Sequence, residues 1–394
     1  MKKFLKILCL LIVCLFVFCP QTAFADEKQQ IEQEIEQNLQ IQLDKIDFSQ
    51  GESVLSELAS NEKQLFGANS FFDKIKQVLN GDFANDADSF LNAFFKLLFD
   101  NILQLLPVLV SIAVVAVLCG IVSNAKSGFL TDSTANMVFL VCFAIVIVLV
   151  LTSVTNLLEV TKYAISSMKN QMNFAFPILL TLMSAIGGTV SVKSYQPAVA
   201  LLSGGVVEVV SNVVLPLFIF SFVFSVVGNL SKNVKLTKLT DFFKSGTNTI
   251  LVVTFTLFTA FLSIQGLTAG TFDDISIRAA KFATKSYVPI LGGYLSDGFD
   301  LILASSVLIK NSVGVAGLVL LVCTILSPIL HILGLSLGLK FVSAITEPVT
   351  DERITSFLSS TSKHLNMLIV SILAVAFMYF ICVMLLIFTS NAFF

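Results

Sequence analysis

Long apolar runs separated by short polar stretches fill the chain beyond residue 97. A helix of about 20 residues is long enough to cross the ~30 Å hydrocarbon layer of a bilayer. The pattern therefore predicts an all-α fold, a polytopic integral membrane protein with seven or eight spans in residues 97–394. The clear runs are residues 102–122, 137–158, 172–192, 250–270, 313–339 and 367–388.

Residues 197–228 form a run that is too long for one straight span. As a helix it would measure about 48 Å, against a hydrocarbon layer of about 30 Å. Gly204, Gly205 and Pro216 are residues at which such a helix could break. We expect either a tilted, kinked helix or two shorter pieces joined by a re-entrant turn.

Residues 288–309 form a second run that does not resemble a simple span. The run contains Gly292 and Gly293, followed by Asp297 and Asp300. Because carboxylates are costly in hydrocarbon, this composition favours a half-membrane hairpin or a broken helix that lines a cavity. An ordinary span is the alternative.

The polar loops give a conflicting signal about orientation. If the chain starts outside, the loop at Lys126 lies inside, the segment at Lys162 and Lys169 outside, and Lys193 inside. The segment 229–247, with four lysines against one aspartate, then lies outside if residues 197–228 cross once. That placement violates the positive-inside rule. A re-entrant turn or a double crossing would return this segment to the cytoplasm.

Residues 1–25 have the features of a secretory signal. They carry three lysines and no acid, an apolar stretch at 7–18, and small residues at Ala23 and Ala25. The pattern predicts a cleaved signal peptide, with an uncleaved anchor helix as the alternative. In either case the following residues are expected outside the cytoplasm.

Residues 26–96 read as a short exported helical segment. They hold fourteen acids against six lysines. Apolar residues recur every three or four positions on one helical stripe, and about three amphipathic helices are expected. This segment could pack on the outer face of its own membrane region or dock to a partner outside the membrane. The stripe consists of Ile31, Ile35, Leu39, Leu43 and Ile46.

The composition fits a membrane protein and offers little for catalysis. Of the 394 residues, 56% are apolar and 13% charged, about half the charged fraction of a soluble domain. The four cysteines beyond the signal lie in separate apolar runs, and there are only two histidines. The chain contains no phosphate-binding loop, metalloprotease motif or nucleophile motif. We therefore predict no enzyme, cofactor, metal or nucleic-acid partner.

Glu208 is the most unusual polar residue in the apolar runs. It lies among valines, with Asn212 four residues on and no basic residue within two helical turns. Such an acid must be neutral, paired across helices or facing water. It could line a conduit, as could Asp297 and Asp300, or make only a structural hydrogen bond. His331 is expected to make a hydrogen bond between helices.

Residues 275–286 read as a separate helix at the membrane interface. Arg278, Lys281 and Lys285 share one face, and two acids, Asp273 and Asp274, precede them at the positive end of the helix dipole. Anchoring at lipid headgroups is the predicted role.

The order of these parts, together with three segments, resembles the stage III sporulation protein AE family of endospore-forming bacteria. The segments are Ile-Arg-Ala-Ala-Lys-Phe at 277–282, Tyr-Val-Pro-Ile-Leu-Gly-Gly-Tyr-Leu-Ser-Asp at 287–297, and Leu-Ile-Lys-Asn-Ser-Val-Gly-Val-Ala-Gly at 308–317. The resemblance covers most of the chain in layout.

The resemblance implies a mother-cell membrane subunit of the secretion-like channel that joins mother cell and forespore and supports late forespore gene expression. Implied partners are a cytoplasmic ATPase, ring-forming proteins and a forespore membrane protein, besides membrane lipid; oligomerisation is left open. It implies no catalytic residues. Under this hypothesis residues 197–228 and 288–309 line the conduit. Two other hypotheses are an ion-coupled secondary transporter that uses Glu208, Asp297 or Asp300, and an assembly scaffold without a conduit.

Overall fold

The computed structural model describes residues 39–43, 46–81, 87–124, 132–230, 236–287 and 292–389. Within these residues the regular elements are all helices, and six of them are long and apolar enough to cross a membrane. The prediction of an all-α, polytopic membrane protein is therefore confirmed. The predicted signal peptide lies outside the described residues.

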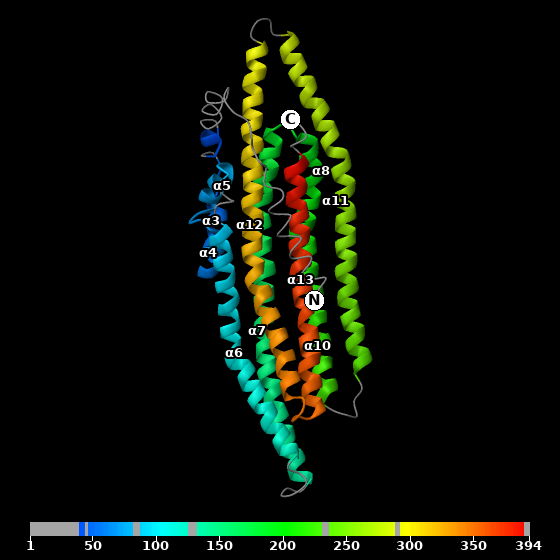
Figure 1. Ribbon diagram of the computed structural model, residues 1–394. Helices are drawn as coiled ribbons and strands as arrows, with labels where there is room; N and C mark the ends of the chain where they lie inside the picture. The colour runs from blue at the N-terminus through cyan, green and yellow to red at the C-terminus, as the bar shows by residue number, and fades with distance from the viewer. Residues whose placement is uncertain are drawn as a thin grey trace.

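Long helices run side by side as a bundle, and three pairs of them turn at the same end, which is lowest in Figure 1. We call this the lower end; the pairs that turn there are α6 with α7, α10 with α11, and α12 with α13. The bounds are α6 Ala87–Asn124, α7 Asp132–Ala185, α8 Thr189–Ala200, η3 Leu201–Val206, α9 Val207–Val209, η4 Val210–Val214, α10 Leu215–Leu230, α11 Thr237–Tyr287, α12 Gly292–Thr346 and α13 Glu352–Thr389.

Helix α7 contains one whole predicted span and most of the next. It has 54 residues, so the runs 137–158 and 172–185 belong to one continuous helix and the chain does not turn at Lys162 or Lys169. The reversal comes later, at residues 186–188. Gly187 has φ +92°, a left-handed conformation that glycine adopts without a Cβ clash. The two predicted spans, 137–158 and 172–192, are therefore wrong as separate crossings.

Helix α12 likewise unites two predicted segments. It has 55 residues and is continuous from Gly292, so it contains both residues 292–309 and the run 313–339. A hairpin between residues 292 and 309 is therefore absent, and Gly292 and Gly293 begin the helix instead of breaking it. Residues 288–291 lie outside the described part of the chain. These two mergers reduce the expected seven or eight spans to six in the described residues.

Residues 189–230 follow one continuous path through α8, η3, α9, η4 and α10, without a re-entrant turn. The predicted disruption takes the form of two π-helical stretches. Gly204 and Gly205 lie in the first, and Pro216 follows the second. Proline lacks an N–H and its ring crowds the carbonyl four residues earlier, which a wider π turn relieves.

These corrections remove the conflict over orientation. Because α7 crosses once from the lower end, α8 starts at the upper end and α10 returns to the lower end (Figure 1). Lys238 and Lys244, in the first turns of α11, thus lie at the same end as the last residues of α6. A single crossing of residues 197–228 agrees with the positive-inside rule when the lower end faces the cytoplasm.

Helices α12 and α13 form the centre of the bundle. In their most apolar windows, 78% and 56% of the residues are buried, against 22–39% in the other candidate spans. Gly334 and Gly338, one turn apart on α12, face Leu105 and Leu109 of α6. Small residues at this spacing let two helices approach closely. The central pair is therefore covered mainly by protein.

In the described part of the segment that is predicted to be exported, three short helices lie on the flank of this bundle (Figure 1). The helices are α3 Ser49–Glu57, α4 Ser60–Phe66 and α5 Phe71–Leu79. The Phe71 ring packs edge-on against Phe174 of α7, with 5.0 Å between centroids, and the Tyr163 hydroxyl donates to the Glu57 carbonyl at 3.1 Å. Of the predicted apolar stripe, Leu43 is buried, and Leu39 and Ile46 pack against the same core cluster.

We expect the attachment of these helices to weaken as pH rises. Glu62 is only 9% exposed, and burial raises the pKa of its carboxyl above the ordinary value, although Ala59 N donates to it at 3.0 Å. The folded state favours the neutral carboxyl of Glu62. The stabilisation that Glu62 gives to the folded state is therefore full below the ordinary carboxyl pKa and is lost as pH rises through the raised pKa.

The test compares proteolysis of α3–α5 in the wild type and in Glu62→Gln, which stays neutral, between about pH 5 and about pH 8. The ratio of wild-type to variant cleavage rates should rise with pH, and taking the ratio cancels the pH dependence of the protease. A constant ratio would show that the pKa of Glu62 in the folded state is not raised into this range.

Candidate functional site

Several polar side chains inside the bundle connect helices. His331 Nδ1 of α12 lies 3.1 Å from Asn101 Oδ1 of α6, which confirms the predicted hydrogen bond between helices. Gln171 Nε2 of α7 donates to Thr324 Oγ1 of α12 at 2.6 Å. These residues are buried or half-buried, and their hydrogen bonds fix the helices relative to one another.

Glu208 is paired across helices and lies at the surface of the bundle. Lys169 Nζ of α7 donates to its Oε1 at 2.8 Å, and Asn212 Nδ2 donates to its Oε2 at 2.6 Å. The side chains of Lys169 and Glu208 are 34% and 53% exposed. Lys169 and Glu208 are 39 residues apart in the sequence and meet because α7 and α8–α10 run antiparallel. The sequence showed the need for a partner but not which residue supplies it.

A groove lies next to this pair, between α7 and the segment α8–η3. Asn173, at its edge, is one helical turn along α7 from Lys169. The groove mixes hydroxyl and amide side chains with small apolar ones, and its exposed amides and hydroxyls can accept and donate hydrogen bonds to water. Its lining residues are Met172, Asn173, Pro177, Leu180, Thr181, Ser184, Val192, Gln196, Val199, Ala200 and Ser203.

The two π-helical stretches set the position of Glu208. Each π turn adds a residue to the helical repeat and so rotates the following side chains around the axis. Glu208 lies in the single α-helical turn between them. At Gly204, in the first stretch, a Cβ would meet no atom within 4 Å, so this part of the wall faces open space.

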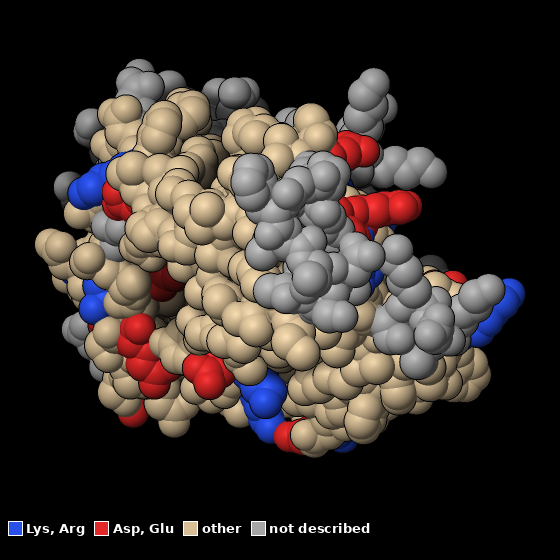
Figure 2. Space-filling view, turned by 90° about the horizontal axis from the view of Figure 1, so that it is seen from below, with Lys and Arg blue, Asp and Glu red and all other residues tan. Residues whose placement is uncertain are grey.

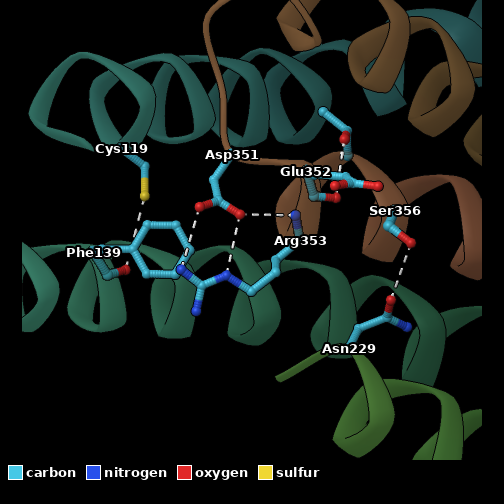
Figure 3. Close-up of polar contacts among 8 residues, drawn as sticks. Cys119, Phe139, Asn229, Asp351, Glu352, Arg353 and Ser356 are labelled. Atoms are coloured by element: carbon cyan, nitrogen blue, oxygen red, sulfur yellow. Dashed lines mark hydrogen bonds and ion pairs between the residues drawn. The ribbon is translucent and has the colours of Figure 1, made fainter. Parts of the chain in front are cut away.

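A second polar cluster lies at the lower end, where α12 turns into α13 (Figure 3). The Arg353 guanidinium lies over the Phe139 ring of α7, 3.9 Å from its centroid, and its Nε and Nη2 donate to both carboxylate oxygens of Asp351 at 3.1 and 3.2 Å. Ser356 Oγ donates to Asn229 Oδ1 at 3.2 Å. Together these contacts connect α13 to α7 and α10.

Sequence reasoning missed the Arg353 cluster. One signal was available: Arg278 and Arg353 are the only arginines in the chain. An arginine placed beside acids at the start of an apolar run is suited to a bidentate pair and to an aromatic face. Its partner Phe139, however, is more than 200 residues away in the chain, and only the fold brings it close.

The predicted interfacial helix is wrong as a separate element. Helix α11 continues through residues 275–286, and Asp273 lies within it. The Asp273 carboxylate accepts from Val190 N at 2.9 Å and Ser191 N at 2.8 Å, so it caps α8. Arg278 is exposed. The side chains of Lys281, Lys285, Asp297 and Asp300 lie outside the described residues.

No group of three or more metal-type ligands occurs among the residues that the structure describes. The described cysteines, Cys119, Cys142, Cys323 and Cys382, are free. The chemistry that the described site offers is therefore hydrogen bonding and charge pairing along a partly exposed polar wall.

Comparison with known proteins gives one consistent match. The family model for stage III sporulation protein AE matches residues 70–390. The stage III sporulation protein AE of Bacillus subtilis (strain 168) is 26% identical over 317 residues, which cover 80% of this chain and 79% of that protein. No solved structure matches the chain.

Proposed function

The chain belongs to the stage III sporulation protein AE family, and from this premise we propose that it is a non-enzymatic subunit of the channel complex between mother cell and forespore. Family membership gives it a role in sporulation. In the proposal it resides in the mother-cell membrane around the forespore. Its partners there are a cytoplasmic ATPase that supplies energy and ring-forming proteins between the two membranes.

The observation that supports a conduit role is the polar groove of α7 and α8–η3, together with the Lys169–Glu208 pair beside it. A passage for polar solutes needs a wall that water can wet. Most other exposed side chains on the long helices are apolar, so this polar wall is the part of the described surface that fits best.

The secondary-transporter hypothesis has less support from the same residues. A coupling carboxylate must exchange its ion or proton during transport, whereas Glu208 accepts from both Lys169 and Asn212. Purified protein in liposomes should therefore show no solute uptake of its own. Uptake that Glu208→Gln abolishes would favour the transporter and overturn the proposal.

The direct test of the proposed function is deletion in the host organism. Late forespore gene expression should stop and the forespore should shrink, and the wild-type gene should restore both. Normal forespore size and normal late expression in the deletion strain would overturn the proposal.

A charge substitution tests the groove itself. An exposed ion pair contributes only about 0–1 kcal/mol, so Glu208→Lys should change the amount of protein in the membrane very little. It places two lysines side by side at the groove, and we expect late forespore gene expression to fall strongly. The double variant Lys169→Glu with Glu208→Lys should recover most of it. Normal expression in the single variant would exclude the groove from the conduit.

A further inference from the structure

We propose that only the lower half of the bundle is embedded in lipid, and that the upper half, together with α3–α5, stands in water outside the cytoplasm. The inference concerns where this chain meets the acyl chains of the bilayer. It does not depend on the conduit proposal, because it rests on which side chains each level of the bundle exposes.

The lower half exposes an apolar belt. On α6 large apolar side chains are exposed from Ile102 to Ile121, and also above this stretch at Leu91, Phe95 and Phe99. On α7 they are exposed from Met137 to Leu151. On α10 the exposed apolar positions extend from Phe220 to Leu230. Figure 2 looks along the bundle from the lower end, and uncharged residues dominate the described surface that is visible. Such a belt on several neighbouring helices marks a lipid or protein interface.

The height of the belt agrees with one hydrocarbon layer. On α7 the stretch from Met137 to Asn156, the first exposed amide, corresponds to about 30 Å of helix, which is the thickness of the layer. Cys119 Sγ contacts the Phe139 carbonyl oxygen at 3.8 Å. Counting along both antiparallel helices from this contact places Ile121 level with Met137, and Ile102 level with Asn156.

The composition of the α7 surface changes at that upper edge. Thr152 and Thr155 donate to backbone carbonyls of their own helix and so are compatible with lipid. From Asn156 upward the exposed positions are mostly polar or charged, beginning with Glu159 and Lys162. A charged side chain at the centre of a bilayer is costly, and this pattern puts these charges at the interface.

The upper half also carries helices α3–α5, which are hydrophilic on their outer side. They contact α7 near Tyr163 and Phe174, above the upper edge of the belt. Helices α4 and α5 also contact α12, and Ser306 Oγ of α12 donates at 2.9 Å to Oε1 of Gln42, which precedes α3. Lipid could not cover this flank of α7 and α12 without also burying the charged faces of α3–α5.

Two consequences follow from this placement of the bilayer. The Lys169–Glu208 pair and its groove lie above the hydrocarbon, so Glu208 faces water and not acyl chains. A conduit that this groove lines is therefore its part outside the bilayer. The apolar upper parts of α12 and α13 are a protein core, which explains why their windows are the most buried. The apolar runs in the sequence therefore mix two environments, lipid and protein interior.

Single cysteines on α7 test this placement in a host that lacks the sporulation proteins. The positions are Ser166 and Asn173 above the belt and Val148 within it, all exposed, with the parent chain as the baseline for its native cysteines. A membrane-impermeant maleimide should label Ser166→Cys and Asn173→Cys in intact cells to the level reached after detergent solubilisation. It should label Val148→Cys only after solubilisation.

Three results would overturn the inference. Protection of both upper cysteines in cells, with labelling in detergent, would place the upper half in the bilayer. Labelling of Val148→Cys in intact cells would show that the belt is not covered by lipid. Labelling of the upper cysteines only after the inner face is opened would reverse the orientation. Because Ser166 and Asn173 are exposed polar positions, poor folding of one variant leaves the other to decide.

Discussion

Replacing Gly120 with alanine is expected to force α6 away from the turn between α12 and α13. A Cβ at this position would lie within 2.8 Å of the Val349 carbonyl carbon and 2.9 Å of Thr350 Cα. These are backbone atoms of a tight turn and cannot swing aside as a side chain would. The shift would also break the hydrogen bond from Thr350 Oγ1 to the Ala116 carbonyl, now 3.1 Å.

We expect a loss of roughly 2–4 kcal/mol, from overpacking and the broken hydrogen bond together. The measurement is the thermal midpoint of the purified protein in detergent, followed by gel filtration after heating. Gly204→Ala is the matched control, because its Cβ would meet no atom within 4 Å. Equal midpoints for the two variants would show that α6 does not pack against the turn as described.

The second large effect is expected from Lys310→Met. Lys310 is a fully buried residue of α12, and its Nζ donates to the carbonyls of Leu386 at 3.1 Å and Ile387 at 2.8 Å. The last carbonyls of a helix have no partner within the helix, so this lysine caps the end of α13. Methionine preserves the length and most of the volume but donates nothing.

The variant leaves the two carbonyls without this donor, at a cost of about 2–4 kcal/mol. We expect a thermal midpoint several degrees lower than in the wild type and faster proteolysis of the end of α13. Lys363→Met is the control, since Lys363 lies on α13, the helix that Lys310 caps, and is exposed. If both variants have the wild-type midpoint, the cap does not contribute to stability.

The division of α7 and α12 into spans could not be predicted from polarity alone. Lys162 and Lys169 interrupt the apolar pattern and so resemble a loop, yet helix formation depends on backbone hydrogen bonds that charged residues also support. The turn occurs instead at Gly187, where a left-handed backbone is needed and the flanking residues are apolar. A hydropathy pattern detects the environment of a helix, not its ends.

The candidate site was predictable in kind but not in composition. The apolar surroundings of Glu208 required a partner or water, and the structure gives it Lys169 as the partner on an exposed face of the bundle. The hydrogen bond of His331 could be predicted because a polar side chain inside an apolar helix needs a partner on a neighbouring helix. Arg353 and the capping lysine Lys310 were not predicted, because their partners lie on helices far away in the chain.

By itself the sequence determined the all-α membrane class and the resemblance to a sporulation family, since these depend on composition and local order. Only the tertiary structure decided that six long helices replace the expected seven or eight, which end of the bundle holds Lys238 and Lys244, and that α12 and α13 are covered by protein. The physical reason is that an apolar side chain is stabilised equally by lipid and by a packed core. Which of the two surrounds it depends on neighbours that the sequence does not place.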